Sequence, residues 1–223
     1  MRIDKRVEAV QWLILVATLA LTAWAWPRVP ERMPVHWNLA GQPDRYGGRV
    51  EGLLMLPLVA VGLYALFLVL PRFDPGRANY PQFGGAYAAI RTAILGVLAV
   101  IHGAVVAVAM GWRGDFGSLI AVVIGAMLAV LGAALPRVQP NWFVGIRTPW
   151  TLSSRRSWER THRVGGRLFV AVGLVTAGLG LVRASWAFVV MMAGLLVGVT
   201  AVIAYSYVVW RDDPDKVPPA GVG

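Results

Sequence analysis

Three histidines offer acid–base and metal chemistry, because imidazole titrates near neutral pH and is a common metal ligand. They are His36, His102 and His162. The chain has no cysteine, which excludes thiolate metal sites, disulfides and cysteine nucleophiles. The chemistry open to each histidine therefore depends on the residues that surround it in the sequence.

The stretch around His36 is dense in polar and turn-forming residues. Its candidate ligand-binding side chains are His36, Trp37, Asn38, Asp44 and Tyr46. A histidine and an aspartate can supply two metal ligands, and Glu31 or Glu51 can supply a third. The segments 38–41 and 42–45 each suit a tight turn. Composition alone favours a rigid interfacial loop, with Trp37 and Tyr46 as anchors, over a ligand or metal site, so a metal is not predicted here.

A second polar stretch runs from residue 137 to residue 166. Its candidate ligand-binding side chains are Asn141, Arg147, Thr148, Trp150, Trp158 and His162. Thr151 or Ser153 can cap a short interfacial helix, on which Trp158 and His162 share one face and Arg155 and Glu159 another. The cluster suits recognition of an anionic group or a protein partner. A basic segment held by anionic lipid explains the same pattern.

Membrane helices must position these residues. The chain is 57% hydrophobic and only 14% charged, with a mean hydropathy of +0.62, which excludes an ordinary soluble domain. Apolar segments of up to about 25 residues, long enough to cross about 30 Å of hydrocarbon, cover residues 10–26, 53–70, 93–111, 116–135, 168–182 and 186–210. The sequence therefore predicts an all-α integral membrane protein with six transmembrane helices.

None of these segments contains Asp, Glu, Lys or Arg, which leaves His102 as the single ionisable residue predicted inside a span. An intramembrane polar residue of this kind is a candidate functional group. A neutral imidazole can equally well hydrogen-bond a neighbouring helix.

The net charge of +10 would suggest nucleic acid in a soluble protein, but here it indicates topology. With both termini in the cytoplasm, the inner segments carry 15 Lys and Arg residues and the outer segments carry 6. The polar loop of His36 is then outside and the basic loop of His162 inside. The predicted units are a three-span half at 1–111, a second three-span half at 112–210 and a disordered cytoplasmic tail at 211–223. No nucleic-acid partner is expected.

Both polar loops resemble a known family. The run Pro34-Val35-His36-Trp37-Asn38, followed by Gly41-Gln42-Pro43-Asp44-Arg45-Tyr46, resembles a domain of unknown function often fused to SdpI-type proteins. Asn141, Gly145-Ile146-Arg147-Thr148-Pro149-Trp150-Thr151, Trp158, Thr161-His162-Arg163 and Gly165-Gly166 resemble the signature of the SdpI family itself. That family is named for a bacterial immunity protein against a sporulation-delaying toxin.

The resemblance implies a multi-pass protein of the bacterial cell membrane that acts in toxin immunity or sensing. It would bind a peptide toxin or an envelope-stress ligand through the outer loop and signal to a cytoplasmic regulatory protein through the inner loop. No cofactor is expected, and the lipid bilayer is an expected partner. One alternative is a membrane-interface hydrolase, with or without a metal, that uses His36 or His162. These two residues would lie about a bilayer apart, so they could not share one centre. A second alternative is a lipid or small-molecule carrier working at His102.

Overall fold

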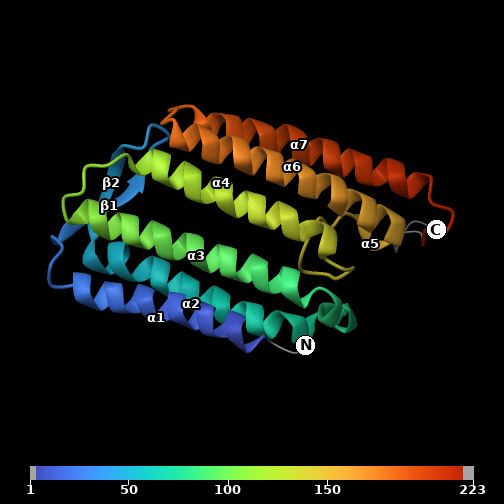
Figure 1. Ribbon diagram of the computed structural model, residues 1–223, viewed down its shortest axis with the longest axis horizontal. Helices are drawn as coiled ribbons and strands as arrows, with labels where there is room; N and C mark the ends of the chain where they lie inside the picture. Colours follow the sequence, from blue (N-terminus) through green and yellow to red (C-terminus); the bar gives the residue numbers. More distant parts are fainter. Residues whose placement is uncertain (1–3, 218–223) are drawn as a thin grey trace.

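The computed structural model describes residues 4–217, and six of its helices are long and apolar enough to cross a membrane. These helices run side by side along the long axis of the molecule (Figure 1). They are α1 (Lys5–Ala25), α2 (Arg49–Phe73), α3 (Gly84–Ala109), α4 (Phe116–Ala134), α6 (Arg155–Leu181) and α7 (Ala187–Arg211). The predicted set of six spans is confirmed.

Short elements close the two ends of the helix array. One end carries the antiparallel strands β1 (Arg32–Trp37) and β2 (Pro43–Gly48), and we call it the hairpin end (Figure 1). Both chain termini lie at the opposite end, which we call the termini end (Figure 1). It carries the 3-10 helices η1 (Arg77–Gln82) and η2 (Leu135–Arg137) and the short helix α5 (Pro149–Leu152).

The hairpin corrects part of the sequence prediction, which expected an irregular loop with two turns. The first turn is present: Asn38 Oδ1 accepts hydrogen bonds from the backbone N–H groups of Ala40 and Gln42, both at 3.0 Å. The second predicted turn, at residues 42–45, is wrong because β2 begins at Pro43 and pairs with Trp37 of β1. Cross-strand pairing supplies there the hydrogen bonds that a local turn would have made.

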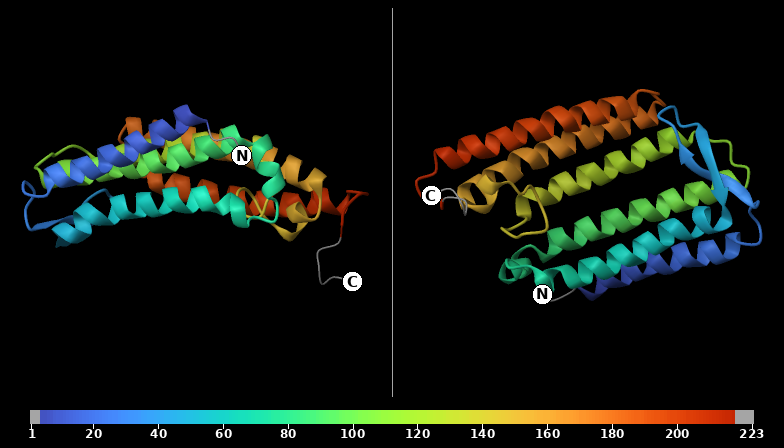
Figure 2. Two further views of the ribbon diagram at one scale, coloured as in Figure 1. Left: turned by 90° about the horizontal axis from the view of Figure 1, so that it is seen from below. Right: turned by 180° about the vertical axis from the view of Figure 1, so that it is seen from behind.

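The helices form two groups, α1–α3 and α4–α7, and the hairpin extends from the first group across to the second (Figure 2). Helices α4 and α6 approach closely through glycines. A Cβ at Gly132 would lie 2.6 Å from the carbonyl oxygen of Gly166, and one at Gly125 would lie 2.6 Å from that of Gly173. Small residues allow such backbone contact, which is how helices gain packing energy in a membrane.

Helices α1, α2, α3 and α6 begin before the apolar segments that predict them. Helix α1 includes Glu8 and α3 includes Arg91, and these side chains form an ion pair of 2.9 Å between Oε1 and Nη1. The side chain of Arg91 is 1% exposed. The helices therefore carry charged residues beyond the apolar segments, in which His102 is the single ionisable residue predicted, and pairing allows two of these charges to lie inside the helix array.

The short interfacial helix expected before the fifth span is part of α6, which runs without a break from Arg155 to Leu181. Its N-cap is Ser154, and Thr148 caps the separate four-residue α5. Residues Trp158 and His162 share one face, as predicted, with ring centroids 4.1 Å apart.

The residues that follow α7, which the sequence predicts to be a disordered tail, pack against the residues just before α6. Asp213 is buried and accepts a hydrogen bond from Ser154, and the Val217 N–H donates to the Ser153 carbonyl at 2.9 Å. Residues 218–223, the rest of that predicted tail, lie outside the described residues.

Candidate functional site

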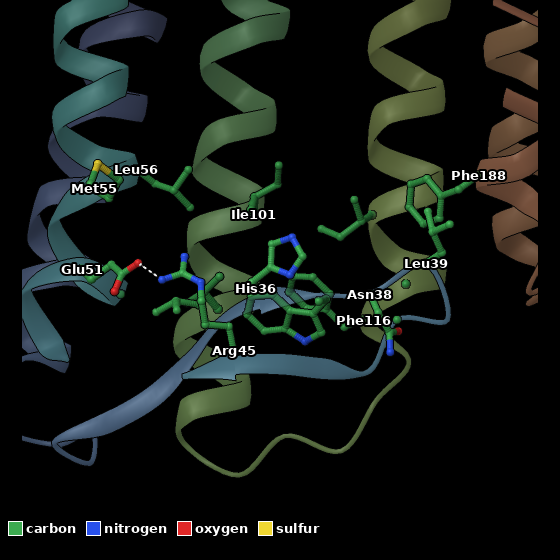
Figure 3. Close-up of a pocket in the computed structure, with 17 residues that line it drawn as sticks. His36, Asn38, Leu39, Arg45, Glu51, Met55, Leu56, Ile101, Phe116 and Phe188 are labelled. Atoms are coloured by element: carbon green, nitrogen blue, oxygen red, sulfur yellow. Dashed lines mark hydrogen bonds and ion pairs between the residues drawn. The ribbon is translucent and has the colours of Figure 1, made fainter. Parts of the chain in front are cut away.

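A cavity of about 530 Å³ lies at the hairpin end, between the hairpin and the ends of the helices (Figure 3). Its walls come from both helix groups and are mostly apolar. They include Met55 and Leu56 of α2, Ile101 and Val105 of α3, Phe116 and Ile120 of α4, and Phe188 of α7. Cavities of this size and apolar character commonly bind small molecules or large side chains.

The hairpin is fastened over this cavity by two contacts with α4. Trp37 stacks on Phe116, with ring centroids 3.9 Å apart and an angle of 11° between the ring planes. Gly41 has a φ of +73°, and a Cβ there would lie 3.0 Å from the Cα of Gly117. The turn therefore needs glycine for its backbone conformation and for its close approach to α4.

His36 and Asp44 form a pair across the two strands, with 2.6 Å between Nδ1 and Oδ1. The carboxylate accepts a hydrogen bond from Nδ1–H, so Nε2 is the ring nitrogen that points away from Asp44. The side chain of His36 lies among the residues that line the cavity (Figure 3). The pair thus presents an oriented imidazole to whatever enters.

A second polar pair lies beside His36, because Arg45 is the cross-strand partner of His36. Arg45 Nη1 lies 2.6 Å from Glu51 Oε1, and both residues belong to the cavity lining (Figure 3). Because Glu51 is engaged with Arg45, it does not join His36 and Asp44. Within residues 4–217, no three His, Asp or Glu side chains are arranged to hold a metal ion.

The structure gathers most, but not all, of the outer candidates. His36, Trp37 and Asn38 line the cavity, and Asp44 lies behind His36. Tyr46 is 50% exposed and is not part of the lining. The apolar walls on α2, α3, α4 and α7 were missed, because in the sequence they are indistinguishable from lipid-facing positions of a membrane helix.

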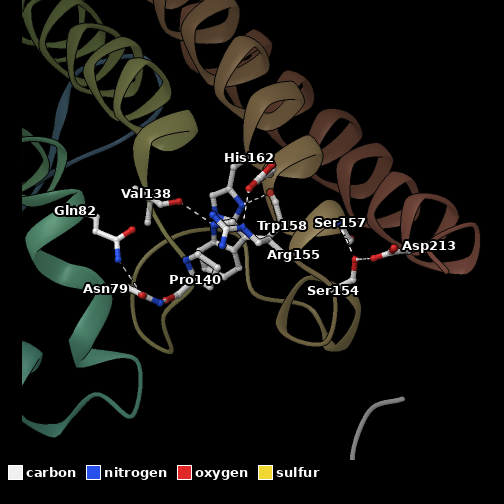
Figure 4. Close-up of polar contacts among 11 residues, drawn as sticks. Asn79, Gln82, Val138, Pro140, Ser154, Arg155, Ser157, Trp158, His162 and Asp213 are labelled. Atoms are coloured by element: carbon white, nitrogen blue, oxygen red, sulfur yellow. Dashed lines mark hydrogen bonds and ion pairs between the residues drawn. The ribbon is translucent and has the colours of Figure 1, made fainter. Parts of the chain in front are cut away.

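The inner candidates lie at the termini end. Residues 138–154 pack there against α6 and α7 (Figure 4). Asn141 is buried, and its Oδ1 accepts from the N–H groups of Phe143 and Val144. Its Nδ2 donates to the carbonyls of Gln139 and Val144, both at 2.9 Å. These four bonds use the amide group fully, so Asn141 shapes the loop.

His162 is held in one orientation by two backbone groups. Its Nδ1–H donates to the Trp158 carbonyl at 2.8 Å, and Nε2 accepts from the Ile146 N–H at 3.0 Å. Trp158 in turn donates from Nε1 to the Val138 carbonyl at 2.8 Å (Figure 4). Both ring nitrogens of His162 are thus occupied, which leaves no lone pair for general-base or metal chemistry.

The other inner candidates differ in exposure. Thr148 is buried and contacts Ser206 of α7, with 3.0 Å between the two hydroxyl oxygens. Trp150 packs edge-on against Tyr207, with ring centroids 5.2 Å apart. Arg147 is exposed, and its Nη1 donates to the Trp142 carbonyl at 2.5 Å. Of the inner candidates, Arg147 is the charged group that a partner can reach.

His102 lies inside the first helix group, next in the chain to Ile101 of the hairpin-end cavity wall. It is fully buried, with 2.9 Å between its Nε2 and Thr22 Oγ1 of α1. This contact is the hydrogen bond to a neighbouring helix that the sequence offered as an alternative to function.

Comparison with known proteins gives two family matches that together cover both polar loops. Residues 13–61 match a domain of unknown function, DUF1648. Residues 137–206 match the SdpI/YfhL protein family. No solved structure matches the chain.

Individual relatives agree with these matches. The Immunity protein SdpI of Bacillus subtilis is 20% identical over 179 residues, which are 80% of this chain and 84% of that protein. An uncharacterized protein of Archaeoglobus fulgidus is 38% identical over 82 residues, 34% of this chain and 43% of the relative. The uncharacterized membrane protein YbgB of Bacillus subtilis is 33% identical over 52 residues, covering 23% of this chain and 57% of the relative.

The cavity-covering hairpin falls in the first matched segment, and the Asn141–His162 loop falls in the second. Together with the six spanning helices, these matches show a multi-pass protein of the bacterial cell membrane, with one segment that matches DUF1648 and one that matches the SdpI/YfhL protein family.

Proposed function

We propose that this protein confers immunity to a membrane-active peptide toxin by binding it at the hairpin-end cavity. The similarity to an immunity protein over 80% of the chain supports a membrane toxin-immunity role at the level of the family. The single observation that carries the binding site is the cavity, because it combines apolar walls with an oriented polar mouth.

The shape and chemistry of the cavity suit the anchoring side chains of an amphipathic peptide. A volume of about 530 Å³ accommodates one or two large apolar side chains rather than a whole peptide. The His36–Asp44 and Arg45–Glu51 pairs can hydrogen-bond the polar backbone or the charged groups next to such an anchor. An envelope-stress ligand with the same amphipathic character would be bound in the same way.

The proposal places the hairpin end outside the cell, in agreement with the excess of cations in the predicted inner segments. Signalling would then use the termini end, where Arg147 stands beside the exposed aromatic residues Trp142 and Phe143. A basic and aromatic surface of this kind suits a cytoplasmic regulatory protein.

The test measures protection and binding together. Cells that produce graded amounts of the protein are challenged with a membrane-active peptide toxin, and binding of the labelled peptide to purified protein is measured. Protection should scale with the amount of protein, and His36→Ala should weaken binding about tenfold. Tyr46→Ala is the matched control, because Tyr46 lies on the same hairpin outside the cavity lining. Equal binding by both variants would refute the cavity as the site.

A hydrolase is the second candidate, because a histidine oriented by a carboxylate is the arrangement of a general base. Among the described residues that line the cavity there is no Ser or Thr, so the base would have to activate water. A hydrolase would degrade many equivalents of peptide, and His36→Ala would abolish turnover while peptide binding persisted. We expect stoichiometric binding without degradation.

A further inference from the structure

A buried charged cluster joins the first three helices near the termini end. Arg91 of α3 forms its ion pair with Glu8 of α1, and Tyr64 of α2 donates from its hydroxyl to Glu8 Oε2 at 2.7 Å. The guanidinium carbon also lies 5.4 Å from the centre of the Tyr64 ring and 5.8 Å from that of Tyr87. The cluster holds Arg91 firmly in place.

Arg91 nevertheless has hydrogen-bond donors that the ion pair does not use. Its Nη1 is paired with Glu8, but Nε and Nη2 are buried and have no hydrogen-bond partner in the part of the chain that the structure describes. A buried guanidinium donor without an acceptor destabilises the fold, because it has lost its hydrogen bonds to water and gained none in return. The arrangement therefore calls for an acceptor from outside the protein.

Arg91 lines a cavity of about 350 Å³ whose other polar residues are Arg72, Arg77 and Tyr80. Arg72 and Arg77 are exposed, so they form the rim while Arg91 forms the floor. We propose that this cavity, which we call the arginine cavity, binds a phosphate group through Arg72, Arg77 and Arg91. Three guanidinium groups converging on one small space match the several acceptor oxygens of a phosphate.

The acidic residues near the arginine cavity are already engaged. Glu8 accepts from Arg91 and Tyr64. Asp74 is buried and accepts from the Tyr80 hydroxyl at 2.8 Å and from the Gly76 N–H at 2.6 Å. With both carboxylates so held, Arg72 and Arg77 stay available to an anion.

The surroundings favour a phospholipid as the source of the phosphate. Phe67, Leu68 and Pro71 complete the lining, and they come from the last turns of α2 at the termini end. A headgroup phosphate sits where a spanning helix leaves the hydrocarbon, and acyl chains would continue along the apolar side chains of α2. This inference concerns the end opposite to the hairpin and does not rest on the proposed toxin site.

The experiment uses the full chain, purified in a neutral detergent. Native mass spectrometry counts the molecules bound on addition of phosphatidylglycerol, of phosphatidylcholine, or of inorganic phosphate without lipid. The test variant is Arg72→Gln with Arg77→Gln, since both residues are exposed and their loss should leave the fold intact. The matched control is Arg160→Gln with Arg163→Gln, which removes the same charge from exposed positions of α6. Arg91→Lys is the third variant, which keeps the charge but loses the Nε and Nη2 donors.

We expect phosphatidylglycerol to bind in preference to phosphatidylcholine, the test variant to lose about tenfold in affinity and the control to match the unmodified protein. Arg91→Lys should lose affinity as well, and if it fails to fold, the rim variant still decides. Binding of inorganic phosphate with the same arginine dependence would support the phosphate site and assign it to a small anion. Equal losses in the rim and control variants, or lipid binding that none of the arginine substitutions at the cavity weakens, would overturn the proposal.

Discussion

Trp37 at the end of β1 lies flat against Phe116 at the start of α4, with 3.9 Å between the ring centroids. Trp37 belongs to the hairpin and Phe116 to the second helix group, and the stack lies in the wall of the hairpin-end cavity. The contact therefore fixes both the position of the hairpin and the shape of the cavity beneath it.

Replacing Trp37 with alanine should loosen the hairpin. Stacked aromatic pairs contribute about 1 kcal/mol beyond the area that they bury. Because the chain has no cysteine, spin labels can be placed at Gln42→Cys and Arg113→Cys alone. We expect their distance distribution, measured by pulsed electron resonance, to broaden in Trp37→Ala. Trp37→Phe keeps a stacking ring and should stay narrow, and an unchanged distribution in Trp37→Ala would show that the stack does not hold the hairpin.

Gly145 should tolerate no side chain. Its φ is +111°, and a Cβ there would lie 2.2 Å from Nε2 of His162, the atom that accepts from the Ile146 N–H. Backbone strain and overpacking together should cost Gly145→Ala about 2 to 4 kcal/mol. Thermal unfolding in detergent measures the loss. Gly96→Ala is the control, because a Cβ at that position meets no atom within 4 Å; equal melting of the two variants would contradict the assigned role of His162.

The N-cap of α4 predicts an acid-dependent stability. Asp115 accepts from the Ser118 hydroxyl at 2.6 Å and from the Ser118 N–H at 2.9 Å, and these bonds lower the pKa of its carboxyl. A lowered folded-state pKa means that the stabilisation is present above the unfolded-state pKa and is lost as the pH falls through the folded-state value.

Asp115→Asn keeps a cap acceptor that does not titrate, so its thermal midpoint should fall less on acidification than that of the unmodified protein. Asp115→Ala should lose about 1 kcal/mol at neutral pH. Melting curves from about pH 7 down to about pH 3 check both expectations. An Asp115→Asn variant with the same acid dependence as the unmodified protein would assign that dependence to other carboxyls.

The excess of cations at the termini end predicts its orientation. A cysteine that replaces the exposed Gln42 in intact cells should react with an impermeant maleimide, and one that replaces the exposed Arg155 should react only after lysis. Both positions are accessible in the fold, so a failure to react reports the membrane side and not burial. Labelling in the reverse order would invert the topology.

Composition and the spacing of charges are enough to predict six spanning helices, because a helix pairs the backbone groups of each apolar segment within that segment, as lipid requires. The two polar loops also stand out in the sequence, and His36 beside Asp44 and Trp158 beside His162 follow from local spacing. The role of each of these residues depends on parts of the chain that lie further away in the sequence. Both nitrogens of His162 are taken by backbone groups, one of them 16 residues away, so a residue suited to chemistry proves to be structural.

Only the tertiary structure determines where the hairpin-end cavity and the arginine cavity form and which residues line them. The walls of the hairpin-end cavity come from the hairpin and four helices. Glu8 pairs with Arg91, which lies 83 residues further along the chain. A prediction from hydropathy ends each span at the first charged residue, so it leaves out Glu8 and Arg91, whose ion pair the packed helices enclose. The sequence determines which segments enter the membrane, since that depends on each segment alone. Which side chains meet depends on how the helices pack, and only the folded chain defines that.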